Sequence, residues 1–441
     1  MSILDNERVR ELSALLKDNA AQNRYLISDL VLEQDGQTLQ FANLVMEGGG
    51  TLGIALVGYV YALEQANIRF LSVGGSSVGA IVALLLSCIG NRTEEKGPAL
   101  AELLSEMDMA SFIDGNAVAR ALSRKLGNMN TEKWKLPFIL LFLLSLNTLL
   151  KYLGLNPGER FLDWLVQCLA DAGVHTMEEA QILLDYLPDG LVHRTRGSGF
   201  AKPETSLKLV VADLTTSSKV IFPEMAPLYW EDPKKINPAR FVRASMSIPF
   251  FFQPMEVRGV SKISDIKERW AKLCSFDGEV PDRITFSDGG LLSNFPISLF
   301  HQERVPDVPT LGARLGSSSR TVKEISTLGG LLGNMISALR HYSDYEFIYN
   351  NPDYSRLLGY IPTEAHSWLN FQMSEAEKQE LFIKGMVSAY DFLETFDWPT
   401  YKQIRREQID LNASLSRFGW GSPRRRNSTS GEDNGKENYN R

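Results

Sequence analysis

The stretch of sequence that decides the fold covers residues 43–89 and reads NLVMEGGGTLGIALVGYVYALEQANIRFLSVGGSSVGAIVALLLSCI. Short apolar runs at 43–46 and 70–74 alternate with longer helix-like segments at 54–65 and 77–89. This alternation is typical of a βαβα unit, whose parallel strands are joined by right-handed crossovers. The stretch therefore predicts an α/β protein with a mainly parallel central sheet.

The chain as a whole has the composition of a globular protein, with 441 residues of which 44% are hydrophobic and 22% are charged. Its length fits either one large α/β domain with insertions or two domains. The net charge of -7 provides no basic field, so nucleic acid is not an expected partner. The three cysteines are widely spaced in apolar or helical contexts, which favours reduced core residues over disulfides or a zinc site.

The cysteines and the N-terminal pattern both indicate a cytoplasmic protein. Residues 1–25 form a charged, leucine-spaced pattern without the apolar core of a secretory signal. Secretion by a signal-independent route stays open.

We expect four regions along the chain. An N-terminal amphipathic helical extension (1–40) precedes the main α/β domain (41–396), which contains a helical insertion at about 100–190. A C-terminal helical segment (397–421) leads into a tail (422–441) that is nearly free of apolar residues and is therefore expected to be disordered. Further strands are expected at 207–212, 220–222, 284–286 and 310–315, and further helices at 159–172, 177–186, 325–341 and 375–396.

A GxSxG pattern, Gly75-Ser76-Ser77-Val78-Gly79, lies between the second strand and the second helix. A nucleophilic serine needs such a sharp turn, because glycines two residues away leave its hydroxyl free above the sheet. The following helix also directs its N-terminal amides at developing negative charge. The pattern predicts Ser77 as a nucleophile, and a small-residue turn without chemistry is the alternative.

A glycine-rich loop one βα unit upstream is expected beside this turn, because neighbouring parallel strands end at the same edge of a sheet. The loop consists of Gly48, Gly49, Gly50, Thr51, Leu52 and Gly53. Glycines let backbone amides approach a substrate oxygen, so the loop is a candidate oxyanion hole with Gly49 and Gly50 as its leading donors. The loop also fits the GxGxxG dinucleotide pattern, but the next strand lacks the acidic residue that would bind a ribose.

A serine nucleophile needs a base, and the best candidate in the sequence is an aspartate. Asp288 follows the apolar run at 284–286, and Gly289 and Gly290 after it leave room for a substrate or another backbone segment. Asp-Gly-Gly is also common in tight turns without chemistry. Asp213 ends another expected strand, but the turn that follows it favours a structural role.

These three motifs occur in the order found in patatin-like phospholipases, and the chain resembles that family over about residues 41–394. The short interval between Gly50 and Ser77 also suits this family better than ordinary α/β hydrolases. The resemblance implies a three-layer sandwich, a catalytic dyad of Ser77 and Asp288, an acyl-enzyme on Ser77, and no metal or other cofactor. The substrate that it implies is a phospholipid or another acyl lipid, cleaved in a phospholipase A or lysophospholipase reaction.

One position departs from the family pattern. Leu52 stands where these proteins usually have Arg or Lys, so a basic residue that would order the loop or attract an anionic head group is missing. Two alternatives stay open: a Ser-His-Asp carboxylesterase that uses His301 or His366, and a non-catalytic lipid-binding relative. The sequence also leaves open an activating protein partner.

The most hydrophobic run in the chain spans residues 136–150. It is short for a membrane-spanning helix and is interrupted by Pro137 and Asn147. A buried helix of the insertion and a lid or membrane-facing helix are the other two interpretations. Flanking lysines and arginines that can meet lipid phosphates favour the last one, so we expect peripheral association with a membrane.

Overall fold

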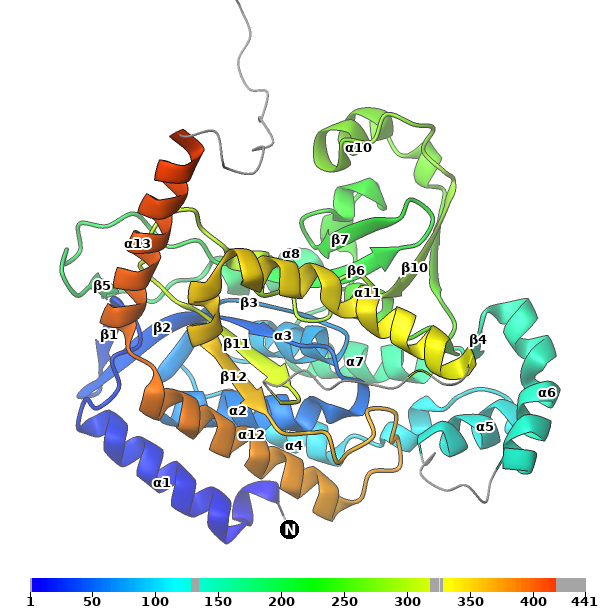
Figure 1. The fold of residues 1–441 in the computed structure, drawn as a ribbon, viewed down its shortest axis with the longest axis horizontal. Coiled ribbons are helices and arrows are strands. Elements are labelled where there is room, and N and C mark those ends of the chain that lie inside the picture. The colour runs from blue at the N-terminus through cyan, green and yellow to red at the C-terminus, as the bar shows by residue number, and fades with distance from the viewer. Residues whose placement is uncertain (1, 128–134, 318–324, 326–327, 418–441) are drawn as a thin grey trace, which may run out of the picture.

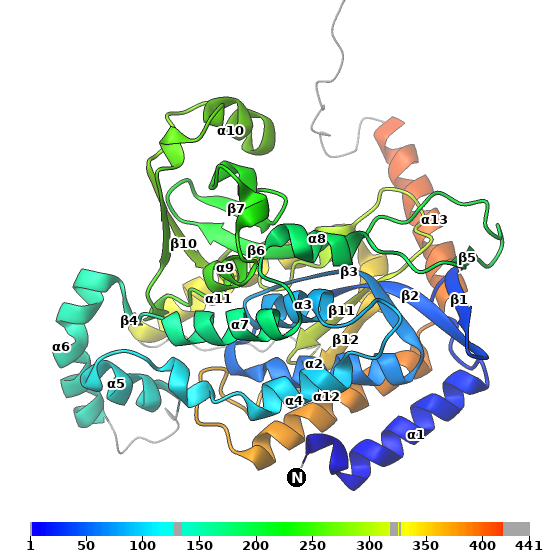
Figure 2. The same ribbon diagram turned by 180° about the vertical axis from the view of Figure 1, so that it is seen from behind.

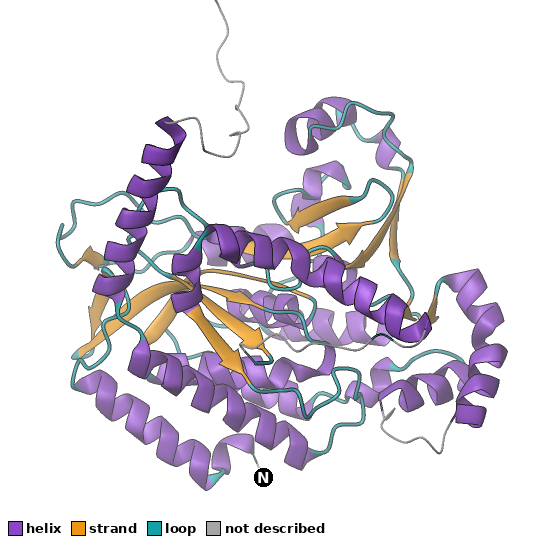
Figure 3. Cartoon of the chain, viewed as in Figure 1, coloured by secondary structure: helices purple, strands orange, loops and turns teal. Residues whose placement is uncertain are grey.

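A mixed sheet of ten strands, counted over the residues that the structure describes, forms the centre of the protein (Figure 3). The structure is a computed structural model that describes residues 2–127, 135–317, 325 and 328–417. The strands are β1 (Leu30–Gln34), β2 (Gln37–Met46), β3 (Ile68–Ser76), β5 (Val192–His193), β6 (Leu207–Asp213), β7 (Ser218–Phe222), β9 (Met255–Arg258), β10 (Arg283–Asp288), β11 (Thr310–Leu315) and β12 (Leu358–Ile361).

The middle of the sheet is parallel. Its main path has the order β12-β11-β2-β3-β6-β10-β9, in which the strands from β12 to β6 run parallel and β10 and β9 continue antiparallel. β3 is buried over its whole length, which explains why it reads as an apolar run without alternation. The expected α/β class with a mainly parallel sheet is confirmed. A separate small sheet pairs β4 (Gly154–Asn156) with β8 (Phe250–Phe252).

Helices cover both faces of the sheet and make a three-layer arrangement. α11 and α13 lie on the face that Figure 1 shows, whereas α3, α7 and α8 lie on the face that Figure 2 brings forward. The helices are α1 (Glu7–Ala21), α2 (Gly53–Gln65), α3 (Val78–Cys88), α4 (Gly97–Glu106), α5 (Ala117–Gly127), α6 (Lys135–Tyr152), α7 (Glu159–Asp171), α8 (Met177–Asp185), α9 (Ala239–Ser245), α10 (Ile266–Cys274), α11 (Leu328–Asn350), α12 (Glu375–Thr395) and α13 (Trp398–Arg417).

The contact between α2 and α12 is unusually close, and two glycines permit it. A methyl group on Gly58 or on Gly385 would meet a backbone carbonyl oxygen of the opposite helix at 2.0 Å. This contact fixes α2, which begins at the glycine-rich loop, against a long C-terminal helix.

Most elements expected from the sequence are present close to their predicted positions. α12, for example, begins after Ser374, whose side chain forms a capping box with Glu377. The helix predicted at 325–341 instead covers Leu328–Asn350, and Asp344 in its added part is buried and accepts hydrogen bonds from the Ser293 hydroxyl and the Phe295 amide. The short strands β9 and β12 were not predicted, because each is completed by a partner distant in sequence.

The expected regions map unevenly onto these elements. Residues 37–40 begin β2, so the expected division after residue 40 falls inside a strand of the central sheet. The insertion expected at about 100–190 contains α4 to α8 together with the short strand β4. α13 covers most of 397–421, while residues 418–441, and with them the expected tail, lie outside the described residues.

α6 contains the most hydrophobic run, and its described side chains face two ways. Leu141 and Leu149 pack against α5 and β4. Outside them, Leu143, Leu144 and Leu150 are 58%, 57% and 73% exposed. The interpretation of this run as a buried helix of the insertion is therefore wrong for the outer face of α6, whose leucines are exposed. Over the described residues, no helix is both long and apolar enough to cross a membrane.

Candidate active site

Ser77 lies at the turn between β3 and α3, where its backbone adopts φ 52° and ψ −124°. Residues other than glycine rarely adopt a positive φ, so the backbone at this turn is strained. A nucleophile elbow requires such a strained turn. Gly75 and Gly79 make this turn possible. A methyl group on Gly75 would meet the backbone of Gly79 at 2.6 Å, and one on Gly79 would meet the Met46 carbonyl oxygen at 2.4 Å.

Asp288 ends β10 and points directly at the serine. The Ser77 Oγ donates a hydrogen bond to the Asp288 Oδ2 at 2.6 Å, although 211 residues separate the two in sequence. The Gly290 amide donates to the other carboxylate oxygen at 2.8 Å, which orients the group. Gly289 packs against the backbone of Val210 in β6, where a methyl group would meet the carbonyl oxygen at 2.0 Å. The sheet and the two glycines thus fix the carboxylate in place.

Both side chains are nearly shielded from solvent, with exposures of 2% for Ser77 and 5% for Asp288. Burial raises the pKa of Asp288 above the usual value of 3.8, while the nearby Arg340 guanidinium and the hydrogen bonds from Ser77 and Gly290 lower it. A carboxylate with a raised pKa is a stronger base, and its ionised form accepts the proton of the hydroxyl group. The pair therefore has the geometry for removing a proton from Ser77.

The glycine-rich loop lies beside Ser77, as the parallel pairing of β2 with β3 requires. A methyl group on Gly48 would lie 3.1 Å from the Ser77 Cβ. The Gly48 amide donates to the Asn294 carbonyl oxygen at 2.9 Å, and the Thr51 amide donates to the Trp368 carbonyl oxygen at 2.9 Å, so both are already used. Gly53 begins α2, where a methyl group would collide with the side chain of Val78.

Two amides of this loop have no hydrogen-bond partner among the described residues. Within the described part of the chain, neither the Gly49 nor the Gly50 backbone N–H forms a hydrogen bond. Gly50 has φ +56°, and a methyl group there would lie 2.1 Å from the Trp368 carbonyl oxygen. A side chain is excluded at this position by both the backbone and the neighbour, and the two amides are free to bind a substrate oxygen.

The structure adds residues that sequence reasoning missed. Asn294 donates from its side-chain amide to the Glu47 Oε1 at 3.0 Å and to the Gly48 carbonyl oxygen at 3.1 Å. Its Oδ1 accepts a hydrogen bond from Arg340 of α11 at 2.6 Å. Burial raises the pKa of the Glu47 carboxyl group to about 7, although the positive charge of Arg314 lowers it. No local pattern marks Asn294, because its partners come from the segment after β2 and from α11.

The C-terminal end of α9 and the residue after it support the elbow from another side. The Ser77 amide donates to the Ser245 Oγ at 2.9 Å, and that hydroxyl donates to the Val210 carbonyl oxygen at 2.7 Å. Met246 places its Sδ 3.2 Å from the Ser77 Oγ. The elbow is therefore held by β6 as well as by its own glycines.

The other candidate bases lie in different settings. Asp213 accepts hydrogen bonds from the Thr215 and Thr216 amides at 2.8 and 3.2 Å and so closes the turn between β6 and β7. His301 bonds to Tyr354 through its Nδ1 at 2.8 Å, and His366 pairs with Glu380 at 3.6 Å. Within the described part of the chain, neither histidine hydrogen-bonds to Ser77 or Asp288.

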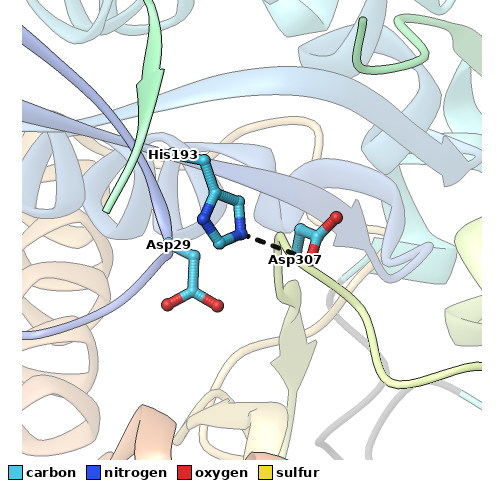
Figure 4. Close-up of side chains that lie close together, drawn as sticks. All are labelled: Asp29, His193 and Asp307. Carbon is cyan, nitrogen blue, oxygen red and sulfur yellow. Dashed lines mark hydrogen bonds and ion pairs between the residues drawn. The ribbon is translucent and has the colours of Figure 1, made fainter. Parts of the chain in front are cut away.

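Asp29, His193 and Asp307 form a compact cluster of groups that can bind metals (Figure 4). Both acids already have cationic partners, since the Lys402 Nζ lies 2.7 Å from Asp29 and an Arg196 nitrogen lies 2.5 Å from Asp307. The Thr195 amide donates to the His193 Nδ1 at 3.3 Å, which leaves the ring proton on Nε2, toward Asp307. The cluster is thus an ion-pair network that ties α13 and β5 to the segment before β11.

The chain belongs to the patatin-like phospholipase family, whose sequence model matches residues 44–301. It is 25% identical over 343 residues to YqhO, an uncharacterized protein of Bacillus subtilis, covering 77% of this chain and 94% of that protein. Triacylglycerol lipase 5 of Saccharomyces cerevisiae is 30% identical over 106 residues, which are 24% of this chain and 14% of the lipase. Lysophospholipase NTE1 of Coccidioides immitis is 29% identical over 106 residues, which are 22% of this chain and 7% of that protein.

Proposed function

We propose that this chain is a lipid acyl hydrolase in which Ser77 is the nucleophile and Asp288 is the general base. The hydrogen bond of 2.6 Å between the Ser77 Oγ and the Asp288 Oδ2 is the observation that carries the proposal. Membership of the patatin-like phospholipase family supports a lipid substrate. The two groups meet in a buried setting beside the glycine-rich loop, in which two amides form no hydrogen bond to any described residue.

The reaction follows from this geometry. Asp288 takes the proton of Ser77 as its Oγ forms a bond to the ester carbonyl carbon, and the carbonyl oxygen takes up the negative charge. The Gly49 and Gly50 amides stabilise this charge by hydrogen bonds. When the intermediate collapses, the bond to the leaving alcohol breaks and the alcohol takes the proton from Asp288. Water then attacks the acyl-enzyme and gives its proton to Asp288, which returns it to Ser77 as the fatty acid leaves.

The substrate class is an acyl ester of the phospholipid, lysophospholipid or related lipid kind. The matched relatives include a triacylglycerol lipase and a lysophospholipase, each over about a quarter of this chain. Leu52 leaves the glycine-rich loop without a cation, and its side chain is buried. The loop therefore contributes amide donors and no charge, so recognition of an anionic head group falls to residues elsewhere.

The outer face of α6 supports action at a membrane. Residues 133–158 contain three lysines and no Asp or Glu, so the sequence around this helix combines apolar and cationic residues. Lys151 and Tyr152 are exposed at the end of the helix, and Phe250, which pairs with Gly154 across the small sheet, is 66% exposed. Leucines insert among acyl chains while lysines meet phosphates. We therefore assign α6 and Phe250 to contact with a lipid surface.

Covalent labelling tests the nucleophile. A fluorophosphonate should label the protein at Ser77, and Ser77→Ala should remove both the labelling and the hydrolysis of lipid esters. If Ser77→Ala kept either one, the assignment would fail. If the wild-type protein neither reacted nor hydrolysed any acyl lipid, the chain would be the non-catalytic relative.

Matched aspartate and histidine variants test the base. Asp288→Asn should lower kcat by about a thousandfold or more, as expected for loss of the group that activates a serine. Asp213→Asn is the control, since Asp213 is also a buried aspartate at a strand end. His301→Gln and His366→Gln should retain activity, and loss of activity in one of them alone would favour the Ser-His-Asp alternative.

A further inference from the structure

A cavity lies at the opposite end of β3 and α3 from Ser77. Its volume is about 590 Å³, which is in the range of pockets that hold small ligands. β3 runs from this cavity to the serine turn, and α3 runs from the turn back to the cavity. A helix of 11 residues is roughly 16 Å long, so the cavity is separate from the candidate active site.

Much of the cavity wall is apolar. The first part of β3, the end of α3 and the end of α8 contribute to it, and α8 lies beside α3 (Figure 2). Four buried side chains of this wall are Phe70, Leu71, Leu86 and Leu184. Ile182 also lines the cavity and is 66% exposed, so it lies on the solvent side. A wall of this kind favours the burial of a hydrocarbon group.

Arg92 places a buried positive charge in this wall, since its side chain lines the cavity and is only 9% exposed. Its guanidinium donates to backbone carbonyl oxygens, among them those of Phe70 at 2.7 Å, Leu184 at 2.7 Å and Tyr186 at 3.0 Å. Burial lowers the pKa of Arg92 to about 10, while the charge of Asp185 raises it. Carbonyl oxygens satisfy the N–H groups, but they do not neutralise the charge.

Lys96 adds a second positive charge to the lining. Its Nζ donates to one backbone carbonyl oxygen at 2.7 Å, and this is the one hydrogen bond of the ammonium group among the described residues. Burial and the nearby Arg92 lower the pKa of Lys96 to about 8, while Glu64 raises it. An ammonium group has three donors, so two are left for another acceptor. The third cation of the lining, Arg69, pairs with Glu95 at 3.8 Å.

The acidic residues of the lining are directed to other partners. Glu94 and Asp185 are exposed to solvent, and each accepts a hydrogen bond from a residue close to it in sequence. Glu64 is buried and accepts a hydrogen bond from a backbone amide at 2.5 Å. In the described part of the chain, none of the three forms an ion pair with Arg92 or Lys96. These two cations therefore lack a carboxylate partner beside a mainly apolar space.

We propose that this cavity binds a single-chain amphiphile with an anionic head group, which lies against Arg92 and Lys96 while the hydrocarbon chain lies along the apolar wall. A buried cation is stabilised by an anion that also accepts its hydrogen bonds. The carboxylate of a fatty acid and the phosphate of a single-chain phosphate ester share this chemistry. The inference does not rest on the function proposed above, because none of these residues belongs to the proposed catalytic site.

Calorimetric titration with dodecanoate and with dodecyl phosphate tests the site, in a Ser77→Ala background that prevents turnover. Lys96→Met should weaken binding by at least about tenfold, because it removes one hydrogen-bonding charge and keeps the length of the side chain. Ile182→Asp should also weaken binding, because it places a negative charge on the solvent side of the cavity. Lys208→Met is the control, since Lys208 is also a half-buried lysine that donates to a backbone carbonyl oxygen, at 3.1 Å, but lies outside the cavity.

The outcomes separate this cavity from other places where an amphiphile binds. Affinities that are unchanged in both Lys96→Met and Ile182→Asp would place the ligand elsewhere and overturn the inference. So would equal weakening in Lys208→Met, the absence of binding by either anion, or equally tight binding of uncharged dodecanol. Binding of one anion alone that is lost in Lys96→Met supports the site and identifies the head group. Ile182→Asp decides the matter if Lys96→Met does not fold.

Discussion

Asn294 and Gly48 are joined by two hydrogen bonds that run in opposite directions. The Gly48 amide donates to the Asn294 carbonyl oxygen, and the Asn294 side-chain amide donates to the Gly48 carbonyl oxygen. One residue follows the segment that carries Asp288, and the other begins the glycine-rich loop. The proposed base and the proposed oxyanion hole are thus fixed to one another by a residue that need not touch the substrate.

We expect Asn294→Ala to lower kcat by about tenfold or more while KM changes little, because the loop that offers the Gly49 and Gly50 amides loses its lateral support. The buried Glu47 Oε1 loses its Asn294 donor, which should also cost about 1–3 kcal/mol of folding stability. Steady-state kinetics and thermal unfolding measure the two effects.

Asn351→Ala is the control for this prediction, since the Asn351 side chain bonds to Phe347 within α11 and to Arg405. An equal loss of kcat in the control would argue against a positioning role for Asn294. So would an unchanged kcat in a folded Asn294→Ala protein.

Gly50→Ala should abolish measurable hydrolysis, with a loss of at least about a hundredfold, as when one oxyanion donor is removed. The residue has a positive φ, and a methyl group would lie 2.1 Å from the Trp368 carbonyl oxygen. Gly36→Ala is the matched comparison, because Gly36 also has a positive φ but has open space around it. That variant should lose only about 1 kcal/mol of stability and keep its activity. Equal activities of the two variants would contradict the assignment of the loop.

The acid limb of the pH–rate profile should report Asp288. A general base works only when it is ionised, so kcat/KM should fall as the pH drops through the pKa of Asp288, which burial raises above 3.8. Burial lowers the pKa of His301 to about 4, so this imidazole is neutral near pH 7. Burial also raises the pKa of Glu47 to about 7. The pH–rate profile of the Glu47→Gln variant therefore shows whether Glu47 contributes to the acid limb. A limb that vanished in His366→Gln would contradict the dyad.

Asp288→Asn should make the protein more stable at alkaline pH than the wild type. The folded-state pKa of Asp288 is raised, so its contribution to stability is present below about pH 4 and is lost as the pH rises through the folded-state pKa. An amide has no such titration. The difference in Tm between variant and wild type should therefore grow with pH, and thermal unfolding at several pH values measures it. A difference that does not change with pH would indicate that the buried carboxylate titrates normally.

Two aspartates on α6 should weaken membrane binding. Leu143→Asp and Leu144→Asp together place charge on the exposed apolar face, and we expect co-sedimentation with vesicles of anionic phospholipid to fall by about tenfold or more. Leu411→Asp is the control, because Leu411 is 53% exposed on α13. Nitrophenyl butyrate in solution should be cleaved at the wild-type rate by all of these proteins. Undiminished binding to vesicles would exclude α6 as the contact.

Much of the candidate site could be predicted from short local sequence patterns. Ser77 and Asp288 were both found from small-residue turns at the ends of apolar runs, because such turns are set by a few neighbouring residues. Asn294 escaped prediction, since it bonds to residues of the segment after β2 and of α11, and no local pattern records those contacts. The exposure of the α6 leucines was also undecided, because a fully apolar helix reads alike whether it is buried or faces lipid.

The sequence by itself determined the βαβα order, the parallel sheet and the residue types at its edge, since these follow from periodicity and from the backbone freedom of glycine. Only the tertiary structure decided that the Ser77 hydroxyl group and the Asp288 carboxylate lie 2.6 Å apart. It also decided that, among the described residues, the Gly49 and Gly50 amides of the glycine-rich loop form no hydrogen bond. Those features depend on contacts between strands and helices distant in sequence, which form only when the sheet is assembled.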